Sequence, residues 1–224
     1  MTTSTLYVTK LAAAKRQIQA AIRMYFLKED ELAIHTVASA AYGLLKDLKC
    51  NRGQSEAADS FHTIIFYMVR DFRRGTLPAH ITCDPSLMAE IERIAVQLSS
   101  ITADSKRSDC QVTLSPSLEK QHWSQSNRAA NFLKHADRDT DGTLALGIID
   151  NHLLLLKCWS AYRDIAPDDL GNEGFVFEAF SAANNPSHQV ADSNFDSLVE
   201  SMRRVPSDHL LEFCYKLIFE MNVS

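Results

Sequence analysis

The chain has 224 residues, 46% of them hydrophobic, and carries 23 Lys and Arg against 28 Asp and Glu, for a net charge of −5. This length indicates one domain, or one domain with a small appendage, with enough apolar material for a buried core. The acidic balance argues against a general attraction to nucleic acid or to an anionic membrane surface. The low content of 7 Gly and 6 Pro is typical of long helices joined by few tight turns.

The first 28 residues differ from the rest because they contain no acid and five bases. An acid-free amphipathic start is compatible with an organelle transit peptide. The spacing of Ile18, Ile22 and Phe26 instead favours a first bundle helix with a basic outer face.

Two features of the sequence bear on its compartment. No segment has 18 uninterrupted apolar residues, so no membrane span is expected. The five cysteines are odd in number and show no Cys-x-x-Cys spacing, which fits a reduced, cytoplasmic setting.

Helical periodicity dominates the chain, and no segment has the alternation of a strand. Helix starts are clearest at Asp84-Pro85 and Ser115-Pro116, where a capping side chain precedes a proline. The pattern predicts helices over 9–27, 30–48, 55–74, 86–101, 116–135, 144–165, 172–183, 193–204 and 207–222. We therefore expect an all-α fold, an antiparallel helical bundle over 1–166 with a helical C-terminal appendage over 167–224 packed on it as one domain overall.

The stretch "NFLKHADRDTDGTL" at 131–144 has two interpretations. In the first, Asp137, Asp139, Asp141 and Gly142 match the first half of a calcium loop. Position 12 of that loop, where calcium requires a bidentate Glu, is Ile148. We therefore expect a solvated turn between helices and no bound metal or other cofactor.

In the second interpretation, Arg128, Asn131 and His135 form a catalytic edge. A rotation of roughly 100° per residue places them within an arc of about 60° near a helix C-terminus. Arg can bind phosphate oxygens, and His can transfer protons near neutral pH, so this trio could promote attack of a ribose 2′-hydroxyl on the adjacent phosphodiester without metal. The alternative is that the two polar side chains are solvated or join helices, and that His135 caps the helix.

The spacing of Arg128 and His135, with six residues between them, resembles the Arg–(four to six residues)–His signature of the HEPN superfamily. That resemblance implies a small helical bundle that often dimerises and, in many members, a metal-independent RNase. The stretches "ANFLKHADRD" and "AIHTVASAAYGLLKDL" also resemble an uncharacterised family of bacterial all-helical proteins.

His35 is a further candidate. It lies one residue away from the apolar face of the second predicted helix and could join a metal site with His135, bridge two helices, or be a satisfied core histidine. No glycine-rich phosphate loop or Gly-x-Ser-x-Gly motif occurs.

Two functions follow as hypotheses. The chain is either a HEPN-like protein directed at RNA or a non-enzymatic helical module that binds a partner protein. We also expect a homodimer, since the basic first helix and the acidic remainder are complementary in charge.

Overall fold

The computed structural model describes residues 7–52, 56–77, 79–106, 115–117, 120, 124, 127–135, 137, 140–167, 170–184 and 193–221. Within these residues every regular element is a helix, which confirms the predicted all-α class. The elements are α1 (Lys10–Phe26), α2 (Glu31–Asn51), α3 (Glu56–Arg74), α4 (Ala79–Thr82), α5 (Pro85–Gln97), α7 (Arg128–Lys134), a 3-10 turn η2 (Leu146–Ile148), α8 (Asn151–Ile165), α9 (Gly171–Ala183), α10 (Ser193–Arg204) and α11 (Leu210–Glu220). None of the described helices combines the length and apolarity that crossing a membrane requires.

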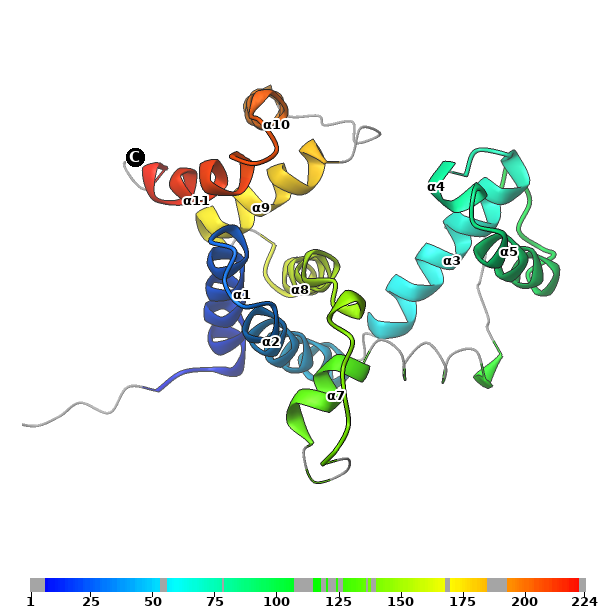
Figure 1. Cartoon of the computed structure of the whole chain (residues 1–224), viewed down its shortest axis with the longest axis horizontal. Helices are drawn as coiled ribbons and strands as arrows, with labels where there is room; N and C mark the ends of the chain where they lie inside the picture. Colours follow the sequence, from blue (N-terminus) through cyan, green and yellow to red (C-terminus); the bar gives the residue numbers. More distant parts are fainter. Residues whose placement is uncertain are drawn as a thin grey trace, which may run out of the picture. The chain divides into compact units, whose positions relative to one another are not determined.

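The chain forms two compact units, which Figure 1 shows in sequence colours. Unit 1 consists of Met1–Arg52 and Asn127–Ser224, and unit 2 of Gly53–Ser126. The boundary expected after residue 166 therefore falls inside unit 1. The C-terminal helices are part of the main core rather than an appendage to it, because their apolar faces are buried together with those of α1, α2 and α8.

Unit 1 is built on the hairpin of α1 and α2. The helix α8 packs along α2 and also contacts α1, while α9 and α11 pack against α1 and α10 packs against α9. Small residues such as Ala14 and Ala21 let these helices approach closely, and the large side chains fill the space between them. The largest fully buried side chains of this core are Ile18, Ile22, Phe26, Leu45, Leu155, Tyr162, Phe177, Met202 and Ile218.

Capping side chains set where the helices of unit 1 begin. Thr9 accepts a hydrogen bond from the Ala12 amide at the start of α1, and the predicted cap Asp30 accepts from the amides of Leu32 and Ala33 at the start of α2. Asp150 accepts from the Leu153 amide in the same way at the start of α8.

The prediction of one helix over 144–165 is therefore wrong at its start. The cap at Asp150 begins α8 at Asn151, and the apolar residues before it form only the short 3-10 turn η2. Helical periodicity in the sequence continued across this boundary, but a side chain that satisfies free amide groups outweighs it.

The predicted helix over 116–135 is interrupted as well. Asn127 lies in a turn, and α7 begins at Arg128. Pro116 and Ser117 are helical, as the Ser115-Pro116 start predicted, but most of 118–126 lies outside the described residues.

Unit 2 contains a separate small core between α3 and α5. The Asp84 carboxylate caps α5 as predicted, accepting from the amides of Ser86 and Leu87. The helix ends at Gln97 rather than near 101, and the Arg73 Nη2 donates to the Ala95 carbonyl at 2.7 Å. A guanidinium at a helix C-terminus satisfies carbonyl groups that have no partner within the helix. The buried members of this core are Ile65, Phe66, Val69, Ile94, Ala95, Leu98 and Ile101.

The core packing predicts a large difference between two phenylalanines of unit 1. Phe177 is fully buried, whereas Phe132 on α7 is exposed. We expect Phe177→Ala to lower the free energy of unfolding by ~3–5 kcal/mol, because it removes a large buried side chain and leaves a cavity. Phe132→Ala should cost less than ~1 kcal/mol. Urea titrations followed by circular dichroism would measure both, and similar losses for the two variants would contradict the assigned core.

Candidate functional site

The predicted catalytic residues lie on α7 and at its C-terminal end. Ala129 is buried and α7 packs on α2, while Arg128 and Asn131 are exposed and their side chains make no hydrogen bond or ion pair with another described residue. His135 is the residue that caps the helix, with φ −128° and ψ 61°. Its conformation is not helical, so the projection at 100° per residue applies to Arg128 and Asn131 but not to His135.

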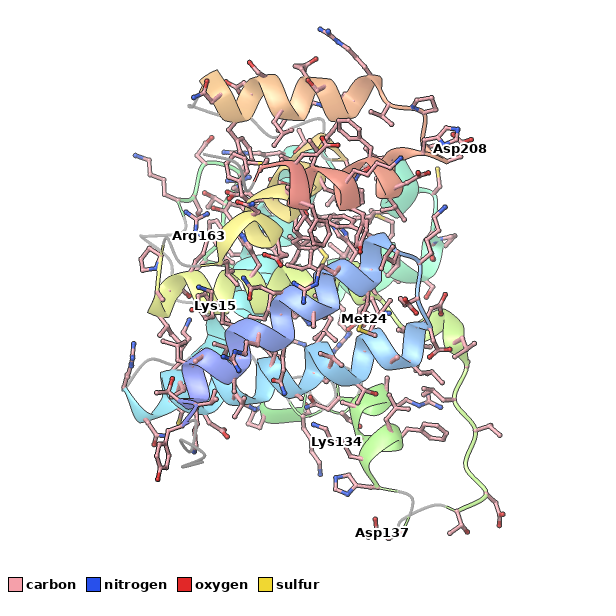
Figure 2. All side chains as sticks on the ribbon, turned by 90° about the vertical axis from the view of Figure 1, so that its left-hand side faces the viewer. Lys15, Met24, Lys134, Asp137, Arg163 and Asp208 are labelled. Atoms are coloured by element: carbon pink, nitrogen blue, oxygen red, sulfur yellow. The ribbon has the colours of Figure 1, made fainter. Side chains whose placement is uncertain are left out.

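The side chain of His135 is directed toward an acid rather than toward the other two residues of the trio. Its Nδ1 lies 3.9 Å from Oδ1 of Asp137. Figure 2 shows Lys134 and Asp137 at an end of unit 1 that projects away from α1 and α2. Arg128, Asn131 and His135 thus belong to one small, exposed element, and none of them lines the three hollows described below.

The calcium interpretation concerns the same projecting end. Asp137 and Asp141 are exposed, and Asp139 lies outside the described residues. Ile148, at the position of the required Glu, is in the 3-10 turn η2. The nearest acid, Asp150, caps α8, so its Oδ1 already accepts a hydrogen bond from a backbone amide. No group of three or more potential metal ligands occurs among the residues that the structure describes.

His35 forms a polar bridge, as one interpretation predicted, but its partner is Asn151 rather than His135. The side chain is 7% exposed, and its Nδ1 lies 3.3 Å from Oδ1 of Asn151. The Asn151 amide nitrogen donates to the Glu31 carbonyl, so its oxygen accepts and the imidazole carries its proton on Nδ1. The bridge therefore joins α2 to the first residue of α8, with the histidine Nδ1–H as the donor.

Burial lowers the pKa of His35, since its Nε2 has no hydrogen-bond partner in the structure and a charged ring there would lack solvation. The hydrogen bond with Asn151 opposes this shift, and the nearby charge of Lys134 adds to it. Burial also lowers the pKa of His152, against the influence of Asp150.

A concave region that sequence analysis did not predict lies between α8 and α9. On α8 it is lined by His152, Leu156, Trp159 and Arg163, whose spacing of i, i+4, i+7 and i+11 puts them on one face of the helix. Two hollows share Trp159 and Glu178 as a common wall. We call the two together the α8–α9 groove.

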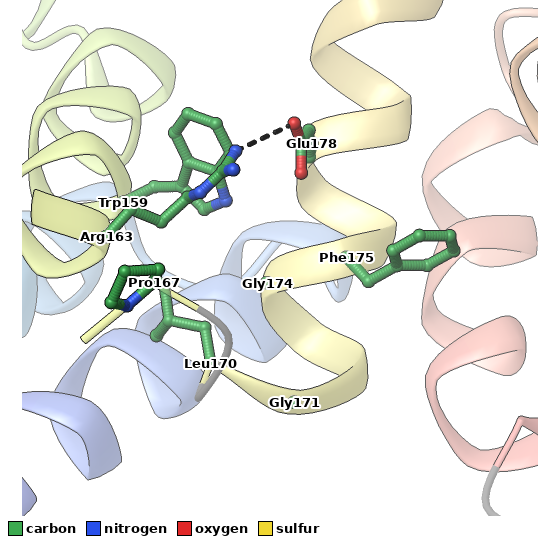
Figure 3. A pocket seen from close by; sticks show the side chains of 8 residues that line it. All are labelled: Trp159, Arg163, Pro167, Leu170, Gly171, Gly174, Phe175 and Glu178. Atoms are coloured by element: carbon green, nitrogen blue, oxygen red, sulfur yellow. Dashed lines mark hydrogen bonds and ion pairs between the residues drawn. The ribbon is translucent and has the colours of Figure 1, made fainter. Parts of the chain in front are cut away.

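The first part, the Gly171 hollow, has a volume of about 190 Å³. Figure 3 shows that Arg163 extends across it from α8 to Glu178 on α9, with Nη1 3.1 Å from Oε1. The guanidinium also lies over the Trp159 ring, 4.6 Å from its centroid. Phe175 points away from the tryptophan and packs on Phe195 of α10.

Two glycines shape this hollow. Gly171 has a φ of +64°, a conformation that other residues adopt only with strain. A Cβ at Gly174 would lie 2.4 Å from the Cβ of Leu170, so no side chain fits there.

The second part, the His152 hollow, has a volume of about 330 Å³. Its apolar lining residues include Leu156, Trp159 and Ala182, and its polar lining residues include Ser181 and Asn184. The two hollows together are in the size range of small ligand pockets or of sockets for large side chains.

The Ser–His pair in the His152 hollow does not have the geometry of a hydrolase. The Nε2 of His152 lies 3.1 Å from Oγ of Ser181, and that hydroxyl donates to the Phe177 carbonyl at 2.8 Å. Because a carbonyl can only accept, the hydroxyl proton is directed away from the histidine, which donates to Oγ. A nucleophilic serine requires the opposite direction.

A third hollow, of about 610 Å³, lies beside the start of α8. Two of its polar lining residues have structural roles, since Asp150 caps α8 and Asn151 forms the bridge with His35. Burial raises the pKa of the Cys214 thiol to about 12, so this cysteine is not a nucleophile near neutral pH.

Comparison with known proteins adds no assignment, since no family model, curated protein or solved structure matches the chain. The sequence signal that could have indicated the groove is the spacing of His152, Leu156, Trp159 and Arg163 together with the pair Gly171 and Gly174. These residues are separated by the turn between α8 and α9, so their proximity requires the fold.

The two histidines predict a pH dependence of stability. Each has a folded-state pKa below its ordinary value of 6.5. As the pH falls below this value the unfolded chain takes up protons that the folded chain does not, so the free energy of unfolding decreases. We expect a lower urea midpoint at about pH 5.5 than at about pH 7.5.

The contribution of His35 can be separated from that of other groups. His35→Gln should make the urea midpoint less dependent on pH over this interval, because it removes one group whose protonation opposes folding. The exposed His209→Gln serves as the matched control and should retain the slope of the wild type. An unchanged slope in His35→Gln would contradict the assignment.

Proposed function

We propose that this protein is a non-enzymatic helical module that binds another protein through the α8–α9 groove. The observation that carries the proposal is the pair of adjoining hollows. Trp159 forms a wall of both hollows, and the Arg163 side chain extends across the Gly171 hollow. Tryptophan and arginine are enriched at the centres of protein interfaces, where they fill or line pockets and are surrounded by a polar rim. A polar rim is present here in His152, Ser181 and Asn184.

A cytoplasmic location is part of the proposal. Cys50, Cys83, Cys158 and Cys214 are free thiols, and two of them are buried. Free thiols are typical of a reducing compartment.

RNA cleavage by a HEPN-like dimer is the second candidate. It is favoured by the exposure of Arg128 and Asn131 and by the partial exposure of His135 on one small element. It requires a second copy that brings additional positive charge to the site, since the net charge of the chain is −5. One base of the first helix, Arg23, is committed to Glu173 of the same chain, which weakens the electrostatic argument for a dimer through α1.

Photocrosslinking tests the proposed function. We expect p-benzoylphenylalanine at position 159, inside the groove, to give one discrete protein adduct in cells that express the chain. The same residue at position 132 should not give that adduct, although Phe132 is also an aromatic side chain accessible to solvent. Leu156→Gln, at the wall of the groove, should then weaken binding of the purified partner at least ~10-fold. The same adduct at both positions, or none at 159, would contradict the proposal.

An RNase assay separates the two candidates. For a non-enzymatic module we expect equal background cleavage of varied RNAs by the wild type, His135→Ala and the control Lys134→Ala. The control removes an exposed side chain adjacent to His135. A loss of about 100-fold in His135→Ala alone would favour the HEPN-like function, since proton transfer by a positioned histidine contributes about this much. Light scattering on the same samples would show whether such activity accompanies a dimer.

A further inference from the structure

We propose that protonation of His35 releases α7 from α2, so that this helix is a cover that opens as the pH falls. His35 is 7% exposed, and the Nε2 of its ring is buried without a hydrogen-bond partner among the described residues. A neutral ring tolerates such a site, whereas protonation places a charged N–H group there with neither solvent nor an acceptor. The buried charge therefore favours an opening of the structure that lets water reach Nε2.

The contact of His35 with α8 survives protonation. The ring donates to Oδ1 of Asn151 through Nδ1–H, and this proton is present in both the neutral and the charged ring. The added proton is carried by Nε2, at another edge of the ring. The helix α8 is also held to α2 by the ion pair of Lys49 with Asp164 and by an extended apolar contact. An opening between α2 and α8 would therefore cost more free energy than one at a smaller contact.

The contact between α7 and α2 is small and lacks polar bonds. Ala129 is the one buried residue of α7, and Ala130 and Leu133 are partly buried. Between the described residues, no hydrogen bond or ion pair joins α7 to α2. The helix has seven residues, and a helix of this length is not stable when it is detached. Release of α7 therefore also unfolds it.

The charge of Lys134, the last residue of α7, directs the opening to this helix. Burial lowers the pKa of His35, the hydrogen bond with Asn151 opposes this shift, and the charge of Lys134 lowers the pKa further. A charged ring would be repelled by the same ammonium group. From the other elements that pack on α2, α8 presents the neutral Asn151 to the ring, and no described residue of α1 forms a hydrogen bond or ion pair with it. Glu31, one turn earlier on α2, is exposed. Movement of α7 thus relieves the repulsion and admits water in one step.

Acid shifts the equilibrium toward the released state. In that state the ring reaches water and its pKa approaches the ordinary value of 6.5, whereas the pKa in the docked state lies below this value. As the pH falls below 6.5, the released state takes up a proton that the docked state does not. Each further pH unit raises the ratio of released to docked α7 by up to ~10-fold, until the docked state is protonated too. Acidification therefore detaches the helix that carries Arg128 and Asn131 from the core of unit 1.

Thiol labelling of the variant Ala129→Cys tests the inference with the full chain. The introduced thiol lies in the contact of α7 with α2, while the exposed Cys50 and the buried Cys158 of the same chain are internal references. The reagent is dithiodipyridine, which reacts with thiols at acidic as well as neutral pH, and mass spectrometry of the peptides resolves the sites. Relative to Cys50, we expect the introduced thiol to be labelled at least ~10-fold faster at about pH 5.0 than at about pH 7.5. At the lower pH it should also react at least ~10-fold faster than Cys158, because α8 stays docked.

Three variants in the Ala129→Cys background separate His35 from other groups. His35→Gln keeps a side-chain donor but removes the titration, so the pH response should fall below ~2-fold. Lys134→Gln removes the repelling charge and should reduce the response severalfold. His135→Gln is the matched control, since His135 caps α7 beside Asp137 and is partly exposed, and it should retain the response.

Several results would overturn the inference. Equal labelling of the introduced thiol and Cys158 would show that acid unfolds unit 1 as a whole rather than releasing α7. A response that persists in His35→Gln, or that is lost in His135→Gln, would assign the pH dependence to a different group. If His35→Gln does not fold, an undiminished response in Lys134→Gln would contradict the proposed mechanism.

Discussion

The arrangement of unit 1 depends on the aromatic contacts that hold α9 against α1. The rings of Phe26 and Phe180 meet edge to face with centroids 5.4 Å apart, and Tyr25 stacks on His152 of α8 at 6.2 Å. These contacts join α1 to α8 and α9, which lie far from it in the sequence. One side of α9 packs in this cluster. The other side of the helix, which carries Gly171, Gly174 and Glu178, therefore forms a wall of the groove.

Polar contacts determine the register of this packing. The Gln19 side chain donates to the Leu170 carbonyl and to Glu173, and Arg23 pairs with the same carboxylate, so α1 holds the first turn of α9 at two points. His35 and Asn151 hold the first residue of α8 to α2 in a similar way. Apolar surfaces alone can slide past each other, whereas a buried hydrogen bond is lost when the register shifts. Burial of the ring at this contact lowers the pKa of His35, and the hydrogen bond with Asn151 opposes that shift.

The sequence predicted the existence of helices well and their ends less well. The caps Asp30 and Asp84 lie at true starts because each has an apolar periodic segment directly after it. At Asp150 the apolar pattern began earlier than the helix, and periodicity could not show which residue would satisfy the free amides. Periodicity also does not show which helix faces pack together. For this reason we did not predict the separate core of α3 and α5, or the inclusion of α9–α11 in the main core.

The candidate site shows the same limit. The trio of Arg128, Asn131 and His135 was inferred from helical geometry, which ends one residue before His135. Trp159 and the glycines of α9 are individually unremarkable in the sequence, and only their packing partners give them a common location. His35 was recognised as a candidate bridge, but its partner lies 116 positions away in the chain.

The two hollows of the groove differ in how the backbone accounts for them. Protein interiors normally leave few voids larger than a water molecule. The Gly171 hollow follows from the backbone, since φ at Gly171 is +64° and the close approach of Leu170 excludes a side chain at Gly174. No such constraint accounts for the His152 hollow, whose walls are ordinary helical positions where a larger residue than Ser181 could stand. The His152 hollow is also the larger of the two, at about 330 Å³ against about 190 Å³, so under the proposed function it is the part of the groove with room for a large side chain of the partner.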